Sequence, residues 1–128
     1  MRKGKIAVNN VLKVEKIFDG VTIGISGSVT ATLDVTALLG STVGKMAFQY
    51  YCASAGTADV EVTYKLSLDN VTFWEPTTPE IKSSITPNST SEAGGGEYDY
   101  EFAPFWEITA TESGAVAVTQ FDFWLAFG

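Results

Sequence analysis

The chain has 128 residues, of which 45% are apolar and 18% charged, and its net charge at neutral pH is −7. This length and composition favour one globular domain over a disordered chain, and no apolar run approaches the roughly 20 residues that a membrane helix needs. The sequence contains one cysteine and no histidine, which excludes an internal disulfide, a multi-cysteine zinc site and histidine-dependent nucleophilic catalysis. We therefore expect no enzyme activity, no cofactor and no metal.

A basic segment, residues 1–10, precedes the predicted domain and includes Arg2, Lys3 and Lys5. The rest of the chain is strongly acidic, and an acidic body repels phosphate groups, which argues against nucleic-acid binding. A basic arm suits an acidic protein surface, so we expect these three residues to bind a partner; a solvated, frayed terminus is the alternative. The segment lacks the apolar stretch of a signal peptide, so we expect the chain to stay in a cytoplasm until it assembles.

Apolar and polar residues alternate with a period of two along much of the chain, which is the pattern of half-buried strands. In chain order the pattern predicts strands at 11–18, 21–25, 29–33, 45–52, 60–67, 97–102, 107–111 and 116–127. Turn residues separate these runs at short intervals, which indicates a sandwich, jelly roll or barrel. We predict a single all-β domain at 11–128, a mostly antiparallel β-sandwich of jelly-roll type with about eight to ten strands.

Some segments carry more specific expectations. The first strand should end at a turn formed by Asp19 and Gly20. Residues 35–39 predict a single helical turn. The last strand, 116–127, is apolar on nearly both faces, so we expect it at the centre of a sheet or under a neighbouring subunit. The stretch 86–96, TPNSTSEAGGG, is polar and Gly-rich, and it predicts a mobile loop that either carries contacts or is a slack connection.

The stretch KLSLDNVTFWEP, residues 65–76, predicts a hairpin connection. Asp69 and Asn70 tolerate the left-handed φ angles of a type I′ turn, and Trp74 lies at the start of the strand expected after it. Ser67, Asp69 and Trp74 also resemble part of the Asp-box of sialidases and related β-propellers. The glycine of that pattern is missing here, and the motif occurs once in a chain too short for a propeller. We therefore expect a structural turn rather than a ligand site.

Glu97, Asp99 and Glu101 share one face of the predicted strand at 97–102. Same-face residues of a strand lie about 6.6–6.8 Å apart, whereas a Ca²⁺ ion needs its oxygen ligands within about 2.6 Å. We predict a solvated acidic face and no metal site. A Ca²⁺ site completed by a loop and a docking patch for the basic arm of another copy are the alternatives.

Aromatic residues gather in the last third of the chain. At period-two spacing such rings are typical of a core or a subunit interface, although exposed rings also stack on sugars or bases. We expect Trp74 and Trp124 to lie outside the core, and together with the basic arm they complete the set of candidate partner-binding residues.

The order of three segments resembles small virion proteins of tailed bacteriophages. The segments are YKLSLDNVTFWEP, a Gly/Ser-rich loop and FAPFWEITATESGAVAVTQFDFWLAF, and the similarity covers roughly residues 44–128. The family consists of β-sandwich or jelly-roll auxiliary proteins, namely head decoration (cement) proteins and neck or tail components. The resemblance implies a structural protein that binds the major capsid protein or other virion proteins, is assembled into the virion in the host bacterial cytoplasm, and forms a homo-oligomer such as a trimer.

The function that we expect is therefore that of a capsid decoration protein, which stabilises the head shell by burying apolar area where shell subunits meet. The alternative is a tail-, neck- or fibre-associated β-sandwich module that recognises a host glycan through exposed tryptophans on a concave face. Neither nucleic acid nor a membrane is an expected partner.

Overall fold

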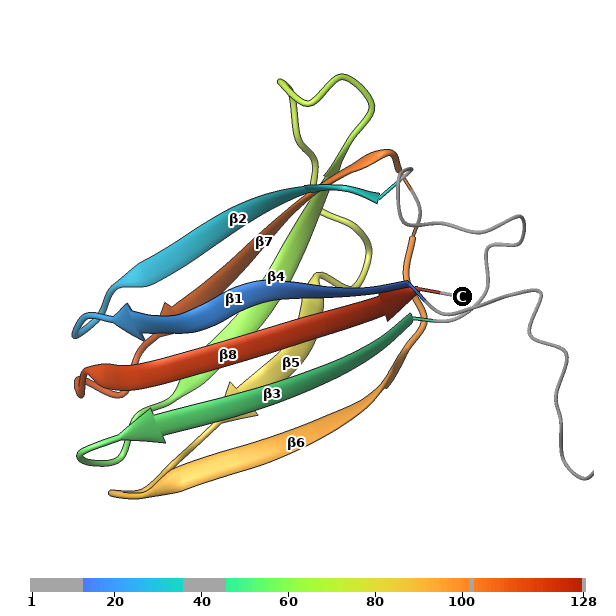
Figure 1. Cartoon of the computed structure of the whole chain (residues 1–128). Helices are drawn as coiled ribbons and strands as arrows, with labels where there is room; N and C mark the ends of the chain where they lie inside the picture. The colour runs from blue at the N-terminus through green and yellow to red at the C-terminus, as the bar shows by residue number, and fades with distance from the viewer. Residues whose placement is uncertain (1–12, 36–45, 102, 128) are drawn as a thin grey trace, which may run out of the picture.

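Two four-stranded antiparallel sheets pack face to face in the computed structural model of the chain, which describes residues 13–35, 46–101 and 103–127 (Figure 1). The strands are β1 (Lys13–Ile23), β2 (Ser28–Asp34), β3 (Met46–Ser54), β4 (Val60–Ser67), β5 (Glu80–Ile85), β6 (Ser91–Tyr98), β7 (Phe105–Glu112) and β8 (Val118–Phe127). Their order is β1-β8-β3-β6 in one sheet and β2-β7-β4-β5 in the other. Successive strands change sheet at every connection except that from β4 to β5, which is a jelly-roll arrangement. The predicted fold class is confirmed.

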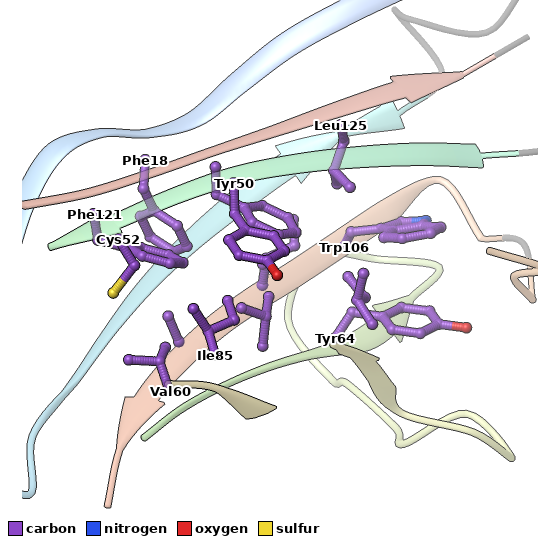
Figure 2. Close-up of a cluster of buried hydrophobic side chains, with 14 of the residues drawn as sticks. Phe18, Tyr50, Cys52, Val60, Tyr64, Ile85, Trp106, Phe121 and Leu125 are labelled. Atoms are coloured by element: carbon purple, nitrogen blue, oxygen red, sulfur yellow. The ribbon is translucent and has the colours of Figure 1, made fainter. Parts of the chain in front are cut away.

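An aromatic layer fills the space between the two sheets, and Figure 2 shows side chains from both sheets pointing into it. Trp106 of β7 stacks on Tyr64 of β4 with ring centroids 4.5 Å apart, and it meets Phe127 of β8 edge-on at 5.5 Å. Trp106 therefore joins the two sheets. Buried residues alternate with more exposed ones along most of β4 and β7, which is why the period-two pattern located these strands correctly.

The last strand, β8, lies between β1 and β3, so its predicted central position is confirmed. Phe121, Phe123 and Leu125 of β8 are fully buried in the core. Asp122 and Trp124 alternate with them and therefore lie on the opposite, outer face of the sheet.

The predicted turn at Asp19 and Gly20 is wrong, because β1 continues through both residues to Ile23. The chain forms a bulge there instead: the register against β8 shifts on both sides of the segment, and Gly20 has a φ of 62°. The Gly20 N–H donates a 2.6 Å hydrogen bond to the Asp122 carboxylate. An Asp-Gly pair is compatible with a bulge as well as with a turn. The hydrogen bond to Asp122 on β8 stabilises the bulge.

Most of the stretch predicted as a loop, 86–96, is strand β6, which pairs with β3 in unbroken register. The run of glycines allows close packing that side chains would prevent. A Cβ atom at Gly94 would lie 2.5 Å from the Tyr50 hydroxyl oxygen, and one at Gly95 would lie 2.5 Å from the Phe48 carbonyl oxygen. Glycine has no side chain, so such a strand leaves no alternating pattern in the sequence.

The strand predicted at 97–102 is consequently wrong, since β6 ends at Tyr98. Glu97, Asp99 and Glu101 do not share a strand face, and the Glu101 carboxylate instead accepts a 2.5 Å hydrogen bond from the Thr77 N–H. Within the described ranges no three His, Cys, Asp or Glu side chains are grouped to hold a metal ion.

The predicted type I′ turn at Asp69 and Asn70 is also wrong. Asn70 has the expected positive φ of 62°, but Asp69 does not. The chain forms a longer loop closed by two main-chain hydrogen bonds of 2.9 Å between Leu66 and Trp74. Trp74 makes only this isolated bridge, so the strand predicted to begin there does not form.

Two expectations fall on other parts of the chain. The predicted arm at 1–10 lies outside the described residues, and so does most of the helical turn predicted at 35–39. None of the helices that the structure describes has the length and apolar character needed to cross a bilayer.

Candidate functional site

Trp124 lies on the outer face of the β1-β8-β3-β6 sheet, turned away from the core. The strand register places Lys16 of β1 on one side of it and Gln49 of β3 on the other. Gly95 of β6 follows Gln49 in the same row. One row across the outer face therefore combines an aromatic ring with a cation, an amide and an open backbone.

Small side chains make up the centre of the next row of the same face, which ends at Glu97 of β6. Ala126 of β8 and Ala47 of β3 lie directly opposite each other, with Val14 of β1 beyond Ala126. Because the alanine side chains at the centre of this row are short, a hollow of about 420 Å³ lies beside Trp124. Its lining consists of Val14, Ala47, Phe48, Gln49, Trp124, Leu125 and Ala126. Gln49 is the one amide side chain in this lining, so the hollow is largely apolar.

A second hollow of about 460 Å³ adjoins the first on the β6 side of the sheet. It is lined by Phe48, Gln49, Tyr50, Ala93, Gly94 and Gly95, and it shares Phe48 and Gln49 with the first. We refer to the two hollows together as the outer-face groove. The groove crosses β8, β3 and β6, and its floor is built of alanine and glycine.

Charged residues at one end of the groove hold Trp124 in place. The Lys16 ammonium lies 4.7 Å from the centroid of the Trp124 ring, a cation–π contact. The same ammonium lies 2.9 Å from the Asp19 carboxylate and 3.3 Å from that of Asp122. Asp122 thus ties Lys16 to the Gly20 bulge, and the position of Lys16 fixes one side of the tryptophan.

Asp122 is ionised in this arrangement although its side chain is buried. Burial alone would raise the pKa of its carboxyl group. Hydrogen bonds from the Gln120 amide and the Gly20 N–H, together with the Lys16 ammonium, outweigh burial and lower the pKa below its ordinary value. The edge of the groove near β1 therefore carries a cluster of paired charges.

Trp74 belongs to a different part of the molecule, the loop that follows β4. The exposed fraction of Trp74 is 44%, and Leu68 and Val71 in the same loop are 71% and 81% exposed. The Asp69 carboxylate accepts hydrogen bonds of 2.9 Å from the Val71 and Thr72 N–H groups. The N–H donors of Thr72 and Val71 and the Ser67 hydroxyl lower the pKa of Asp69. This loop therefore exposes apolar side chains, and the hydrogen bonds to Asp69 hold its main chain.

The two predicted partner-binding residues that the structure describes, Trp124 and Trp74, lie apart. Trp124 lies on the outer face of one sheet and Trp74 follows a strand of the other. Arg2, Lys3 and Lys5 lie outside the described residues. Sequence reasoning missed the alanines that form the groove. Outward-facing alanines on two neighbouring strands are the signal, but recognising it requires the strand register.

Glu112 and Cys52 are two buried titratable groups elsewhere in the described residues. The Glu112 carboxylate accepts hydrogen bonds from the N–H groups of Ser26 at 3.0 Å, Asp59 at 3.4 Å and Gly114. Burial alone would raise the pKa of Glu112, but these donors lower it. Burial raises the pKa of the Cys52 thiol to about 12, so this thiol is protonated at neutral pH and unreactive.

Comparisons with known proteins show similarity in fold. No family model matches the chain, and no match was found among curated proteins. Among solved structures it is similar to the CBM22-1 xylan-binding domain of Xyn10C from Paenibacillus barcinonensis, with a TM-score of 0.59 and 14% identity over 91% of this chain and 81% of that one. It is also similar to the PBSX exported protein XepA, with a TM-score of 0.56 and 10% identity over 98% of this chain and 39% of that one.

A third similarity is to a chain in the structure of infectious bursal disease virus Gx strain. The TM-score is 0.50 and the identity 12%, over 91% of this chain and 31% of that one. The chain thus spans less than half the length of XepA and of the viral chain. At these identities the likeness shows the β-sandwich fold, which carbohydrate-binding and viral proteins share, and no more.

Proposed function

We propose that the chain is a structural protein of a tailed-bacteriophage virion, namely a decoration protein that binds the head shell. The observation that carries the proposal is the hollow beside Trp124 in the outer-face groove, whose lining side chains are apolar except for the Gln49 amide and the Trp124 N–H. The chain as a whole is acidic, with a net charge of −7. An apolar hollow on an acidic protein favours docking of an apolar protein surface over binding of a charged ligand.

Binding through this groove would stabilise the shell by mass action. A protein that binds only the assembled shell lowers the free energy of that state relative to its dissociated subunits. Removing apolar area from water contributes roughly 25 cal/mol per Å², and the alanine and glycine floor allows close approach of a partner. The major capsid protein is the proposed partner, the virion is the proposed location, and association of the chain with copies of itself, for example as trimers on a symmetric shell, is part of the same proposal.

The test measures binding to heads of the virus that encodes the chain, prepared without this protein. Ala126→Glu places a charge in the groove, and Thr109→Glu places the same charge at the centre of the outer face of the other sheet, between Thr30 and Thr63. We expect Ala126→Glu to lower co-sedimentation with heads at least tenfold and Thr109→Glu to leave it within about twofold. Equal binding by both variants, or no binding by the wild-type chain, would contradict the proposal.

A second candidate function rests on the pairing of Trp124 with Gln49. An aromatic ring beside an amide is an arrangement that can stack on a sugar ring and hydrogen-bond its hydroxyls, so the groove could accept a host glycan. Affinity electrophoresis in soluble xylan and in host surface polysaccharide tests this candidate. Retardation that Trp124→Ala abolishes would favour glycan recognition, whereas unretarded migration in every polysaccharide together with head binding would favour decoration.

A further inference from the structure

The four edge strands of the sandwich differ in how they are protected against pairing with another strand. An edge strand exposes one row of main-chain N–H and C=O groups, and proteins normally shield it with charges, prolines, bulges or shortness. The edges here are β1 and β6 in one sheet and β2 and β5 in the other. Their comparison singles out β2.

Three edges carry a recognisable obstacle. The register of β1 against β8 shifts three times, and that of β5 against β4 shifts twice. The sequence of β6, SEAGGGEY, has glycine at its centre and so offers no side chains for a partner strand to cover. The sequence of β2, SVTATLD, has neither glycine, proline nor lysine, its one charge is Asp34 at the C-terminal end, and all seven of its residues pair with β7 without a shift.

The main-chain groups that β2 turns outward can be assigned from its two ends. The Gly27 carbonyl accepts a 2.9 Å hydrogen bond from the Glu112 N–H, and the Val35 N–H donates a 2.9 Å hydrogen bond to the Pro104 carbonyl. Main-chain groups alternate sides along an antiparallel strand, so the odd-numbered residues between these ends bond to β7. Thr30 and Thr32 therefore point their N–H and C=O groups toward the open edge.

The side chains of β2 are self-complementary about Ala31. If a second copy of β2 runs antiparallel with Ala31 facing Ala31, then Val29 faces Leu33 and Thr30 faces Thr32. Apolar side chains face each other on the core side, Ser28 faces Asp34 at each end of the outer side, and no two charges of the same sign meet. The directions of the main-chain groups also fit this register. Each Thr30–Thr32 pair would exchange two main-chain hydrogen bonds, and the Ala31 pair would be of the non-hydrogen-bonded type.

The core side of β2 is incompletely covered in a single copy. Val29, Ala31 and Leu33 pack against the core but are only half-buried, whereas alternate residues of the neighbouring β7 are buried. A second copy across the edge would cover these half-buried side chains. The edge therefore offers both main-chain groups that pair with no other described strand and apolar area to the same occupant.

We infer that β2 is a self-association edge, at which two copies of the chain join their second sheets into one eight-stranded sheet across a two-fold axis. The interface deepens the self-association of the proposed function by naming the edge at which two copies meet; it lies on a different sheet from the outer-face groove, so its test does not depend on binding to heads. Pairing along seven residues buries less area than the roughly 1,200 Å² of stable interfaces. We therefore expect a dimer whose population rises with concentration.

A cysteine cross-link tests the register directly. Ala31→Cys would bring two Cα atoms to about 4.5 Å across the axis, within the range of about 4.4–6.8 Å that a disulfide requires. Val29→Cys is the matched control, because in the same register its two copies are offset by four residues, roughly 13 Å along the strand. Cys52, the native cysteine, is buried and remains protonated at neutral pH.

Copper–phenanthroline with dioxygen as the electron acceptor is the oxidant, and non-reducing electrophoresis is the readout. We expect Ala31→Cys to form a covalent dimer at least tenfold faster than Val29→Cys. Equal cross-linking of the two variants, or none of either, would overturn the inferred register.

A pair of charge variants tests the same edge without a covalent bond. Thr30→Lys/Thr32→Lys would place like charges opposite each other across the axis, and Thr30→Glu/Thr32→Lys would place opposite charges there. The two share the loss of the 3.1 Å Thr30–Thr109 hydroxyl contact and differ only at position 30. Sedimentation equilibrium should show dimers of the wild-type chain and of the Glu/Lys variant, and a dissociation constant at least tenfold higher for the Lys/Lys variant. A wild-type chain that stays monomeric at all concentrations, or two variants that associate equally, would overturn the inference.

Discussion

The two sheets of the sandwich have similar inner faces and different outer ones. Both contribute aromatic and aliphatic residues to the shared core. The outer face of the β2-β7-β4-β5 sheet presents threonines in register, Thr30, Thr109 and Thr63, with Glu107 and Lys65 in the next row. The outer face of the β1-β8-β3-β6 sheet presents Trp124 above a floor of alanine and glycine.

This difference distinguishes the outer face that needs no partner from the outer face that leaves apolar area available to one. A solvated sheet face is satisfied by hydroxyls and paired charges, which need no partner. A face that combines a tryptophan with small residues leaves apolar area and a hollow exposed to water, and neither contributes to the stability of the single chain. The groove is therefore the part of the surface that folding does not explain, while the contribution to assembly that we propose for the second sheet lies at its edge, β2.

The largest expected effect contrasts two tryptophans. Trp106→Ala should lower the free energy of unfolding by about 3–5 kcal/mol, because Trp106 stacks on Tyr64, contacts Phe127 and donates a 3.2 Å hydrogen bond to the Ala103 carbonyl. Trp124→Ala should cost no more than about 1 kcal/mol, because its ring lies outside the core. Urea denaturation followed by circular dichroism measures both.

The contrast depends on the two substitutions behaving differently. A loss of stability from Trp124→Ala as large as that from Trp106→Ala would show that the outer face is part of the folding core. Unchanged stability together with lost binding of heads or glycan would sharpen the distinction between the two faces.

The next effect concerns the glycines of β6. Gly95→Ala should destabilise the fold by about 1–3 kcal/mol, since its Cβ would lie 2.5 Å from the Phe48 carbonyl oxygen, a main-chain atom fixed in the sheet. Gly96→Ala is the matched control, because its Cβ would approach the Phe48 ring only to 3.4 Å, which is ordinary contact. Thermal unfolding of the two variants gives the comparison. Equal melting temperatures would show that the floor of the groove is not closely packed.

The sequence predicts the strands whose burial alternates and misses the features that depend on distant partners. Inward rings alternate with polar residues in β4 and β7, so both strands are visible in the pattern. The Gly20 bulge depends on Asp122, which lies 102 positions away, and β6 is built from glycines that carry no pattern. Local residue chemistry could therefore not locate either feature.

The same limit applies to the candidate site. The exposure of Trp124 could be predicted because Gln120 and Asp122 share its side of the strand. The groove beside it could not, since it arises where Ala47 and Ala126 come into register on neighbouring strands. Trp74 was expected in a strand and lies in a loop closed on Leu66, because the hydrogen bonds of Asp69 favour a longer turn than the Asp-Asn pair suggests.

The smallest expected effect concerns the ion cluster that borders the groove. Asp122→Asn keeps an oxygen that can accept from the Gly20 N–H but removes the charge that faces Lys16 at 3.3 Å. We expect a loss of about 1 kcal/mol in the free energy of unfolding at neutral pH. The position of Lys16 over Trp124 should loosen as well, so the indole fluorescence of the variant should shift while its core remains intact.

The pH dependence follows from the lowered pKa of Asp122, whose ordinary value is 3.8. A carboxyl group with a lower pKa in the folded chain than in the unfolded chain stabilises the fold above its ordinary pKa, and this contribution is lost as the pH falls through the folded value. The difference in stability between the wild-type chain and Asp122→Asn should therefore be largest near pH 7 and shrink as the pH falls below the ordinary value of 3.8. If this difference in stability does not change with pH, the charge of Asp122 does not help to hold Trp124 in position. The contrast between the two outer faces would then depend only on the alanine and glycine floor of the groove.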